Sequence, residues 1–288
     1  MKPAPFEYHA PRTLPEVLER LAQVGDDARL LAGGQSLVPS MNLRLARPAV
    51  LIDLNRVREL DYIRAADGAL AIGALVRQRV AERSDAVRRS APLLAQALPF
   101  IGHPTIRNRG TVGGSLAHAD PAAELPGVAA ALDADLVIAS ARGRRVVKPS
   151  EFFVSYLTTA LQPDEVLVEV RLPAAGPGTR SAFVELARRH GDFALVGVAL
   201  ALELDDARAC RTARVALVGV GPGPVRAAQA ERCLAGRVVT GVVAREAAEC
   251  AAKEIDPPAD LHATSHYRRR LAAALVEDAI RQALGLSR

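Results

Sequence analysis

Two glycine pairs stand out in this chain as residues that could bind an anion. The first is Gly33-Gly34, followed by Ser36, and the second is Gly113-Gly114, followed by Ser115. Glycine has no Cβ and tolerates positive φ angles, so a Gly-Gly segment can turn several backbone N–H groups toward one point. Two such segments would suit a diphosphate. The alternative is that each pair is an ordinary turn, which is the usual explanation of an isolated Gly-Gly.

The sequence around the pairs predicts the elements that would position them. A strand-like run at 28–31 precedes the first pair, and 37–45 can begin a helix whose N-terminus faces an anion. The segment Thr13-Leu14-Pro15-Glu16 predicts the start of a helix over 14–24, and Asp67-Gly68 predicts a hairpin turn. Further helices are expected at 83–98, 122–131, 225–234, 241–253 and 265–284.

The text around the glycine pairs resembles one protein family. Three segments carry the resemblance: LAGGQSLVP at 31–39, IRNRGTVGGSLAHADP at 106–121 and FVELARRHGDFA at 183–194. Shorter matches extend it over the chain, at 6–11, 51–54 and 267–270. In this order the segments resemble the FAD-binding medium subunit of the molybdenum-containing hydroxylases, the carbon monoxide dehydrogenase and xanthine dehydrogenase family.

The resemblance implies an α+β fold in two parts. Residues 1–175 would form a two-subdomain FAD-binding domain of the PCMH type, with subdomains at about 1–59 and 60–175. Residues 178–288 would form a smaller α+β C-terminal domain of the carbon monoxide dehydrogenase flavoprotein type. The sequence itself also predicts a boundary at 173–179, because two prolines and two glycines in these seven positions interrupt both strands and helices.

The resemblance also implies an extended FAD whose pyrophosphate lies between the two glycine pairs. Non-covalent binding is expected, because Gln35 stands where some flavoproteins of the wider superfamily carry a flavin-linked histidine. The cofactor-binding residues implied for the two loops are Leu31, Ala32, Gly33, Gly34, Gln35, Ser36, Thr111, Gly113, Gly114 and Ser115.

Further residues match family positions near the cofactor. Asp120 and Glu124 would hydrogen-bond sugar hydroxyls, although acidic residues at a helix N-terminus are an equally good explanation. Phe193 follows a Gly-Asp pair, where the carbon monoxide dehydrogenase branch has an aromatic residue against the flavin ring; a core phenylalanine is the alternative. The residues that would line the flavin, or else simply belong to the core, are Ile101, Ala117 and Leu167.

The function implied by the resemblance is electron transfer, with no catalytic residue and no metal ligand in this chain. Electrons would pass from [2Fe-2S] clusters of a small partner subunit through FAD to an external acceptor. Molybdopterin would belong to a large partner subunit, and the three subunits would form a dimer of heterotrimers. A stand-alone flavin oxidoreductase of the same superfamily and a structural subunit without cofactor are the alternatives. Branches that reduce NAD carry a lysine where this chain has Val184 and Glu185, which disfavours NAD as the acceptor.

Composition is typical of a soluble globular protein. The 288 residues are 50% hydrophobic with a net charge of +5. The sequence has no basic stripe with interleaved aromatics, so nucleic acid is not expected as a partner. The sequence has no run of about 18 apolar residues, so no membrane span is predicted. The first residues also lack the apolar stretch of a signal peptide, and a cytoplasmic location is therefore expected. Cys210, Cys233 and Cys250 are widely spaced, which argues against an iron–sulfur or zinc site.

Two other patterns are weaker. Residues 215–224 outline a strand, a glycine turn and a helix, but the register is Gly-x-Gly-x-Gly and prolines remove amide donors from the turn. Ser115, His118 and Asp120 lack the Gly-x-Ser-x-Gly segment of a hydrolase nucleophile.

Overall fold

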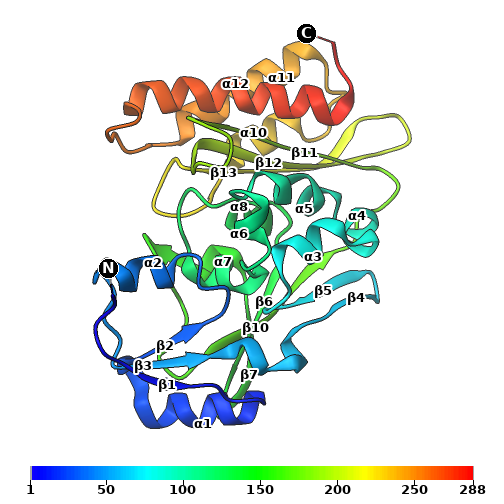
Figure 1. Ribbon diagram of the computed structural model, residues 1–288. Coiled ribbons are helices and arrows are strands. Elements are labelled where there is room, and N and C mark those ends of the chain that lie inside the picture. Colours follow the sequence, from blue (N-terminus) through cyan, green and yellow to red (C-terminus); the bar gives the residue numbers. More distant parts are fainter. Residues whose placement is uncertain (1, 288) are drawn as a thin grey trace.

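The computed structural model describes residues 2–287 and is built in layers (Figure 1). A small N-terminal sheet, a central five-stranded sheet and a C-terminal four-stranded sheet follow one another along the molecule. One group of helices lies between the central and the C-terminal sheet, and the last helices cover the outer face of the C-terminal sheet. The α+β class expected from the sequence is confirmed.

The N-terminal unit is a parallel sheet with one long helix. Its strands lie in the order β1 (Glu7–His9), β3 (Val50–Asp53) and β2 (Ala28–Leu31). The helices of this unit are α1 (Leu14–Val24) and the short α2 (Leu37–Asn42), which follows the first glycine pair.

Helix α1 begins where the sequence predicts. The Thr13 hydroxyl accepts a hydrogen bond from the backbone N–H of Glu16, and Pro15 lies in the first turn, where its missing N–H costs nothing. Leu14, Val17 and Leu21 form the buried face. Their spacing places them on one side of the helix, so α1 is held by its apolar stripe.

The central sheet is antiparallel throughout. Its strands lie in the order β4 (Ile63–Ala66), β5 (Ala69–Gly73), β10 (Val166–Pro173), β6 (Asp135–Ser140) and β7 (Gly143–Val147). The β4–β5 hairpin turns at Asp67 and Gly68, with φ of 52° and 74°, as the Asp-Gly pair predicts. Beside the sheet lie α9 (Pro149–Phe152) and a two-stranded hairpin of β8 (Phe153–Ser155) and β9 (Thr158–Thr159).

Six short helices, called here the middle helices, lie between the central and C-terminal sheets. They are α3 (Gln78–Arg83), α4 (Asp85–Ser90), α5 (Pro92–Ala97), α6 (Pro104–Arg107), α7 (Val112–His118) and α8 (Glu124–Ala131). The expectation of one helix over 83–98 is wrong. Ser84 caps α4 by accepting from the N–H of Val87, and Pro92 starts α5, so the chain turns at each of these positions.

The C-terminal sheet is antiparallel and covered by three helices. Its strands lie in the order β11 (Thr179–Ala187), β12 (Ala194–Leu204), β13 (Cys210–Val218) and β14 (Val225–Arg226). The helices are α10 (Ala228–Leu234), α11 (Gly241–Glu254) and α12 (Ser265–Leu284). The helix expected over 225–234 begins only at Ala228, because residues 225–226 pair with β13.

Alternate residues of the C-terminal strands face two different cores. Phe183, Ala199 and Ala201 join the core that the middle helices form on the central sheet. Val198 and Leu200 face the other way, into a core shared with α10, α11 and α12. A third core joins the N-terminal unit to the opposite face of the central sheet. The middle helices are therefore enclosed between two sheets.

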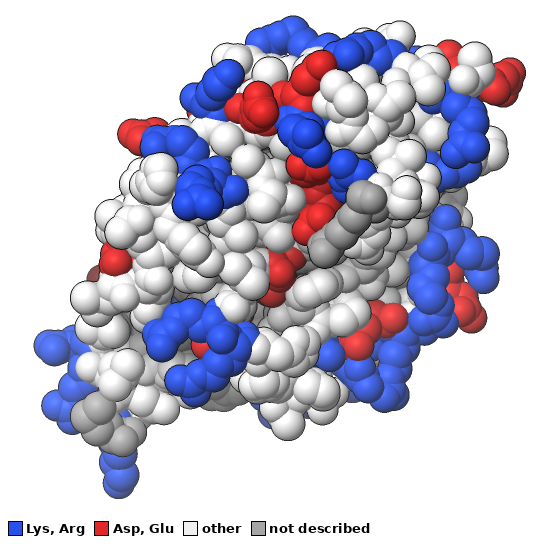
Figure 2. Space-filling model, turned by 90° about the horizontal axis from the view of Figure 1, so that it is seen from above, with Lys and Arg blue, Asp and Glu red and all other residues white. Residues whose placement is uncertain are grey.

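On the face seen from above, Lys and Arg form several separate groups with Asp and Glu among them (Figure 2). Within residues 2–287, no helix is both long and apolar enough to cross a membrane.

Candidate functional site

The fold brings the loops that carry the two glycine pairs into contact, although they are far apart in the sequence. A Cβ on Gly33 would lie 2.6 Å from the carbonyl oxygen of Arg109 and 2.8 Å from the Cα of Gly110. A Cβ on Gly114 would lie 3.4 Å from that of Ala32. The two loops thus touch through their backbones, and packing between them requires a glycine at position 33.

The first loop presents backbone donors that the protein does not use. Gly34 has a φ of +74°, and in the part of the chain that the structure describes, the N–H groups of residues 33–36 donate to no protein acceptor. Gln35 folds back on the loop, its Nε2 donating to the Gly33 carbonyl oxygen at 3.2 Å. Helix α2 begins directly after these residues and adds the positive end of its backbone. Such a group of donors can bind a phosphate.

Two polar side chains that the sequence did not single out hold the loops together. Asn55 Nδ2 donates to the Ala32 carbonyl oxygen at 2.9 Å. The guanidinium of Arg77 donates both to Asn55 Oδ1 and to the Arg109 carbonyl oxygen, so it joins the first loop to the second. Neither residue belongs to a recognisable motif. Only the pairing of Arg77 with Thr111 in space reveals the connection.

The second glycine pair does not offer the free amides expected of it. The Gly113 N–H donates to the Ala74 carbonyl oxygen at 2.9 Å, the Gly114 N–H to Thr111 Oγ1 at 3.0 Å, and the Ser115 N–H to the Thr111 carbonyl oxygen at 3.2 Å. The expectation of a second set of free N–H donors at 113–115 is therefore wrong, because these groups cap α7 and dock it on residue 74. The Ser115 hydroxyl has no protein partner among residues 2–287.

The residues predicted to line the flavin divide into core and surface. Ile101 and Leu167 are buried in the core between the central sheet and the middle helices, and Ala117 packs against that core. Phe193 is different, since 63% of its surface is exposed. It ends the loop 188–193 between β11 and β12 and is not a core phenylalanine. An exposed ring offers a face on which a planar ligand can stack.

Asp120 and Glu124 have different environments. Asp120 Oδ1 accepts the N–H of Ala122 at 2.9 Å, so this carboxylate fixes the turn before α8. Glu124 lies in the first turn of α8 and is only 5% exposed. Burial raises the pKa of Glu124 to about 7; Asp120 acts in the same direction, and the Glu124 backbone N–H and Arg107 act against it. A buried carboxyl with a raised pKa is frequent in functional sites.

Glu185 is a second carboxyl with a raised pKa, half-buried on the C-terminal sheet, which the sequence marked only as the residue in place of a lysine. It lies on β11, two residues from Phe183 and therefore on the same face of the sheet. Its Oε2 atom is buried and has no hydrogen-bond partner. Burial, and then the charge of Glu124, raises the pKa of Glu185 to about 8.

The glycine turn within 215–224, which resembles a dinucleotide-binding segment only in outline, has a structural role in this fold. The Gly219 N–H donates to the Pro121 carbonyl oxygen at 2.8 Å, so the glycine turn after β13 joins the C-terminal sheet to the segment before α8. Across residues 2–287, no three His, Cys, Asp or Glu side chains are grouped so as to hold a metal ion.

Comparison with protein families assigns both parts of the chain. Residues 4–175 match the family described as the FAD binding domain in molybdopterin dehydrogenase. Residues 181–283 match the family described as the CO dehydrogenase flavoprotein C-terminal domain. The two matches follow each other in the same order as the two parts implied by the resemblance.

Individual relatives match over nearly their whole length. The 6-hydroxypseudooxynicotine dehydrogenase complex subunit alpha of Paenarthrobacter nicotinovorans is 41% identical over 288 residues, which cover 100% of this chain and 97% of the relative. The caffeine dehydrogenase subunit beta of Pseudomonas sp. (strain CBB1) is 40% identical, with 98% of this chain and 96% of the relative covered.

Solved structures agree. A chain of the carbon monoxide dehydrogenase from Hydrogenophaga pseudoflava superposes with a TM-score of 0.96 at 38% identity, covering 100% of both chains. A chain of the quinoline 2-oxidoreductase from Pseudomonas putida 86 gives 0.93 at 40% identity, covering 99% of both. The chain therefore belongs to the FAD-binding medium subunits of the molybdenum hydroxylases and is a component of an oxidoreductase.

Proposed function

We propose that this chain binds FAD non-covalently, with the diphosphate on the free N–H groups of residues 33–36 and the flavin ring toward Phe193. The observation that carries the proposal is that set of unused donors, held in place against the second loop. Gly33 is buried and the other three residues are half-buried, so these N–H groups face the edge of the fold, where a bound phosphate would accept from them. The residues present therefore fit the cofactor that the family implies.

The residues of the two loops would have distinct tasks at this site. Gly33 and Gly34 let the backbone approach the phosphates, and the hydroxyls of Ser36 and Ser115 add donors beside them. Asn55 and Arg77 keep the loops at a fixed separation. Bound FAD would supply the electron-accepting and electron-donating chemistry, while the protein supplies position and electrostatics.

The electron path would run from iron–sulfur clusters of a small partner subunit through FAD to an external acceptor. A large partner subunit would carry molybdopterin, and two such heterotrimers would associate in the cytoplasm. Relatives of this chain bear names such as carbon monoxide dehydrogenase medium chain and glyceraldehyde dehydrogenase medium chain, which supports a place in a complex of several subunits. This electron path requires no substrate-binding site in this chain.

The substrate of the complex would be set by another subunit. Two relatives of about equal identity to this chain, 41% and 40%, are subunits of dehydrogenases named for 6-hydroxypseudooxynicotine and for caffeine. Since similar flavin subunits accompany such different substrates, this chain would contribute the common electron-transfer step.

The acceptor would be a quinone, a cytochrome or oxygen, in preference to NAD. The position of the lysine found in NAD-reducing branches is occupied here by Val184 and Glu185. Stopped-flow reoxidation of the reduced complex tests this assignment. Rapid turnover with NAD and none with a quinone analogue would overturn it.

The flavin itself is tested by the absorption spectrum of the purified chain, which should show one FAD per polypeptide. Co-purification with iron and molybdenum supports the three-subunit enzyme over a stand-alone flavin oxidoreductase. A colourless chain that takes up no FAD would contradict the proposed function, and FAD without associated metal subunits would contradict the electron path.

A further inference from the structure

Two polar contacts join α10 to α11, the helices on the outer face of the C-terminal sheet. The Glu254 carboxylate, at the end of α11, accepts the backbone N–H of Gln229 at 2.9 Å, near the start of α10. The guanidinium of Arg237, just after α10, donates to Glu246 at 2.7 Å, nearer the start of α11. The two helices are therefore antiparallel, and these contacts fix which of their residues face each other.

Cys233 and Cys250 face each other midway between these contacts. Cys233 is four residues from both 229 and 237, and Cys250 is four residues from both 246 and 254. Residues four apart share a helix face, so each cysteine points toward the other helix. Both side chains are partly buried and pack against the same apolar core. Two thiols from different helices thus meet at one place on the α10–α11 boundary.

The two thiols interact directly. Burial above all raises the pKa of Cys233, and Cys250 acts in the same direction, both through its charge and through a hydrogen bond between the two thiols. Arg237 acts against them. Sulfur atoms that share a hydrogen bond need only a small movement to reach the S–S distance of a disulfide, about 2 Å.

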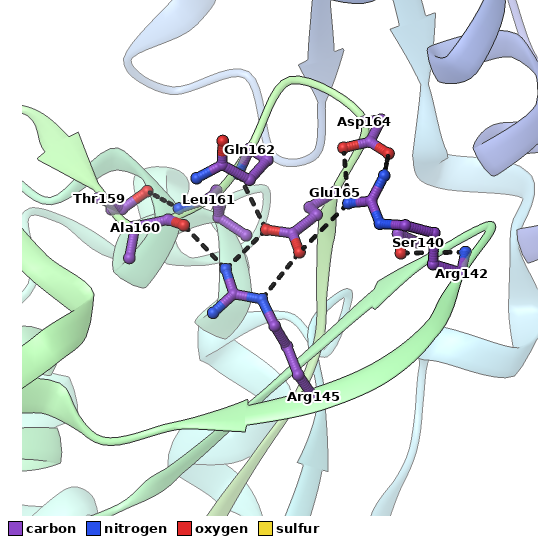
Figure 3. A network of polar contacts seen from close by, with 9 residues as sticks. All are labelled: Ser140, Arg142, Arg145, Thr159, Ala160, Leu161, Gln162, Asp164 and Glu165. Atoms are coloured by element: carbon purple, nitrogen blue, oxygen red, sulfur yellow. Dashed lines mark hydrogen bonds and ion pairs between the residues drawn. The ribbon is translucent and has the colours of Figure 1, made fainter.

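Arg237 places a positive charge beside this pair. In the network of Figure 3, Arg145 donates from two nitrogens to the two oxygens of Glu165, at 2.8 and 2.7 Å. Arg237 differs, because its Nη1 serves Glu246, the Cys233 carbonyl oxygen at 3.3 Å and the Cys233 sulfur at 3.8 Å. A guanidinium next to a sulfur favours the thiolate, which is the form that oxidants attack.

Cys210 has the opposite surroundings. It is fully buried on β13, and its thiol donates to the Thr212 carbonyl oxygen at 3.4 Å. Burial, and then the charge of Glu203, raises the pKa of Cys210 to about 11. A thiol of this kind is inert, so the chain contains its own control for the pair.

We propose that Cys233 and Cys250 are a redox-active pair that closes an intrachain disulfide between α10 and α11 when hydrogen peroxide oxidises it. One thiolate attacks the peroxide: an S–O bond forms, the O–O bond breaks, and the departing hydroxide takes up the proton of that thiol to give water. The second thiol then attacks this sulfur, an S–S bond forms, and the S–OH group leaves as a second water. The two sulfurs lose the two electrons that the peroxide gains. A dithiol reductant restores both thiols.

The disulfide should stabilise the fold in which it forms. It closes residues 234–249 into a loop, which restricts the unfolded chain, and it joins helices that are already in contact. This proposal is independent of FAD binding, because neither cysteine belongs to the glycine loops or to the segment around Phe193.

The test treats the purified full chain with hydrogen peroxide at mildly alkaline pH, unfolds it, and labels the remaining thiols with N-ethylmaleimide for mass spectrometry. Wild type should lose two hydrogen atoms, yield a linked 233–250 peptide pair and carry the label only on Cys210. The control Cys210→Ala should form the same link, whereas Cys233→Ala and Cys250→Ala should form none. Dithiothreitol should restore labelling of all three cysteines in wild type. Free thiols at 233 and 250 after peroxide, separate sulfinic acids or links between two chains would each overturn the proposal.

Urea unfolding of the same samples provides the second measurement. The midpoint of oxidised wild type should lie above that of the reduced protein, while peroxide should leave the midpoint of Cys250→Ala unchanged. A lower midpoint in oxidised wild type would show that the native helices do not accommodate the link, and it would also overturn the proposal.

Discussion

Replacing Gly33 by alanine should separate the two loops and release FAD. Gly33 has no positive φ, so the backbone accepts alanine without strain, but the new Cβ would lie 2.6 Å from the Arg109 carbonyl oxygen. That is about 0.4 Å closer than the 3.0 Å that real Cβ contacts respect, and the obstacle is backbone, which cannot rotate away. We expect a loss of about 1 to 3 kcal/mol in the free energy of unfolding, as for an overpacked core.

The effect on the cofactor should be larger than the effect on stability alone suggests. A hydrogen bond to a charged group contributes roughly 1.5 to 3 kcal/mol, so misplacing one or two N–H donors should cost about 2 to 4 kcal/mol of FAD binding. The dissociation constant should then rise roughly 30- to 1,000-fold. Titration of flavin fluorescence gives this constant, and urea unfolding gives the stability.

Comparing alanine variants of two glycines with the same φ angle distinguishes the effect of backbone strain from the effect on FAD binding. Gly34 and Gly68 both have a φ of +74°, and a Cβ on Gly68 would meet no atom within 4 Å. Alanine at either position should cost about 1 to 2 kcal/mol of stability through the left-handed conformation. Gly34→Ala should also weaken FAD, whereas Gly68→Ala should leave FAD affinity unchanged. If Gly33→Ala binds FAD as tightly as Gly68→Ala does, the diphosphate does not lie on the first loop.

Three further results are expected. Phe193→Ala should weaken FAD by about 1 to 3 kcal/mol without altering stability, whereas Tyr156→Ala, which removes another exposed aromatic ring, should do neither; equal affinities in a flavin titration would remove Phe193 from the site. Acid precipitation should release all flavin into the supernatant, since Gln35 cannot form a covalent link, and yellow colour in the pellet would contradict this. Glu185→Gln should be more stable than wild type at pH 9 and similar near pH 5, because a carboxyl whose pKa is raised from 4.5 to about 8 loses stability as pH rises through that window. The gain, measured by urea unfolding at both pH values, should be about 1 to 3 kcal/mol after allowance for partial exposure.

Local sequence signals predict local structure well in this chain. The Thr13 cap and Pro15 set the start of α1, and Asp67-Gly68 sets the β4–β5 turn, because each depends on residues only a few positions apart. Where the local signal is mixed, the prediction is less good. In α12 the spacing predicts one apolar face of Leu271, Leu275 and Ala279. Ala279 is buried, but the two leucines are only partly buried, and Ala272 and Val276, one position after each leucine, are buried instead.

The parts of the site that the sequence did not reveal all depend on contacts between distant segments. The N–H groups of 113–115 resemble a second phosphate loop in the sequence, but in the fold Ala74 accepts the N–H of Gly113, and Thr111 accepts those of the next two residues. Arg77 and Asn55 are unremarkable until the fold places them across the two loops. A family resemblance identifies which loops matter, but the use of each donor is decided by packing.

The shared core also constrains how the C-terminal sheet could act in the proposed electron transfer. Phe183 packs in the core of the middle helices, Gln96 exchanges hydrogen bonds with Ser181, and Arg226 donates to the Ala130 carbonyl oxygen at 3.1 Å. Moving this sheet would expose an apolar face and break these bonds, so it behaves as part of the cofactor domain and not as a hinged lid. The loop that carries Phe193 also contacts the middle helices, since Gly191 lies directly against the ring of His103. If electrons pass through FAD as proposed, this shared core would hold the C-terminal sheet and the FAD-binding domain at one separation during the transfer.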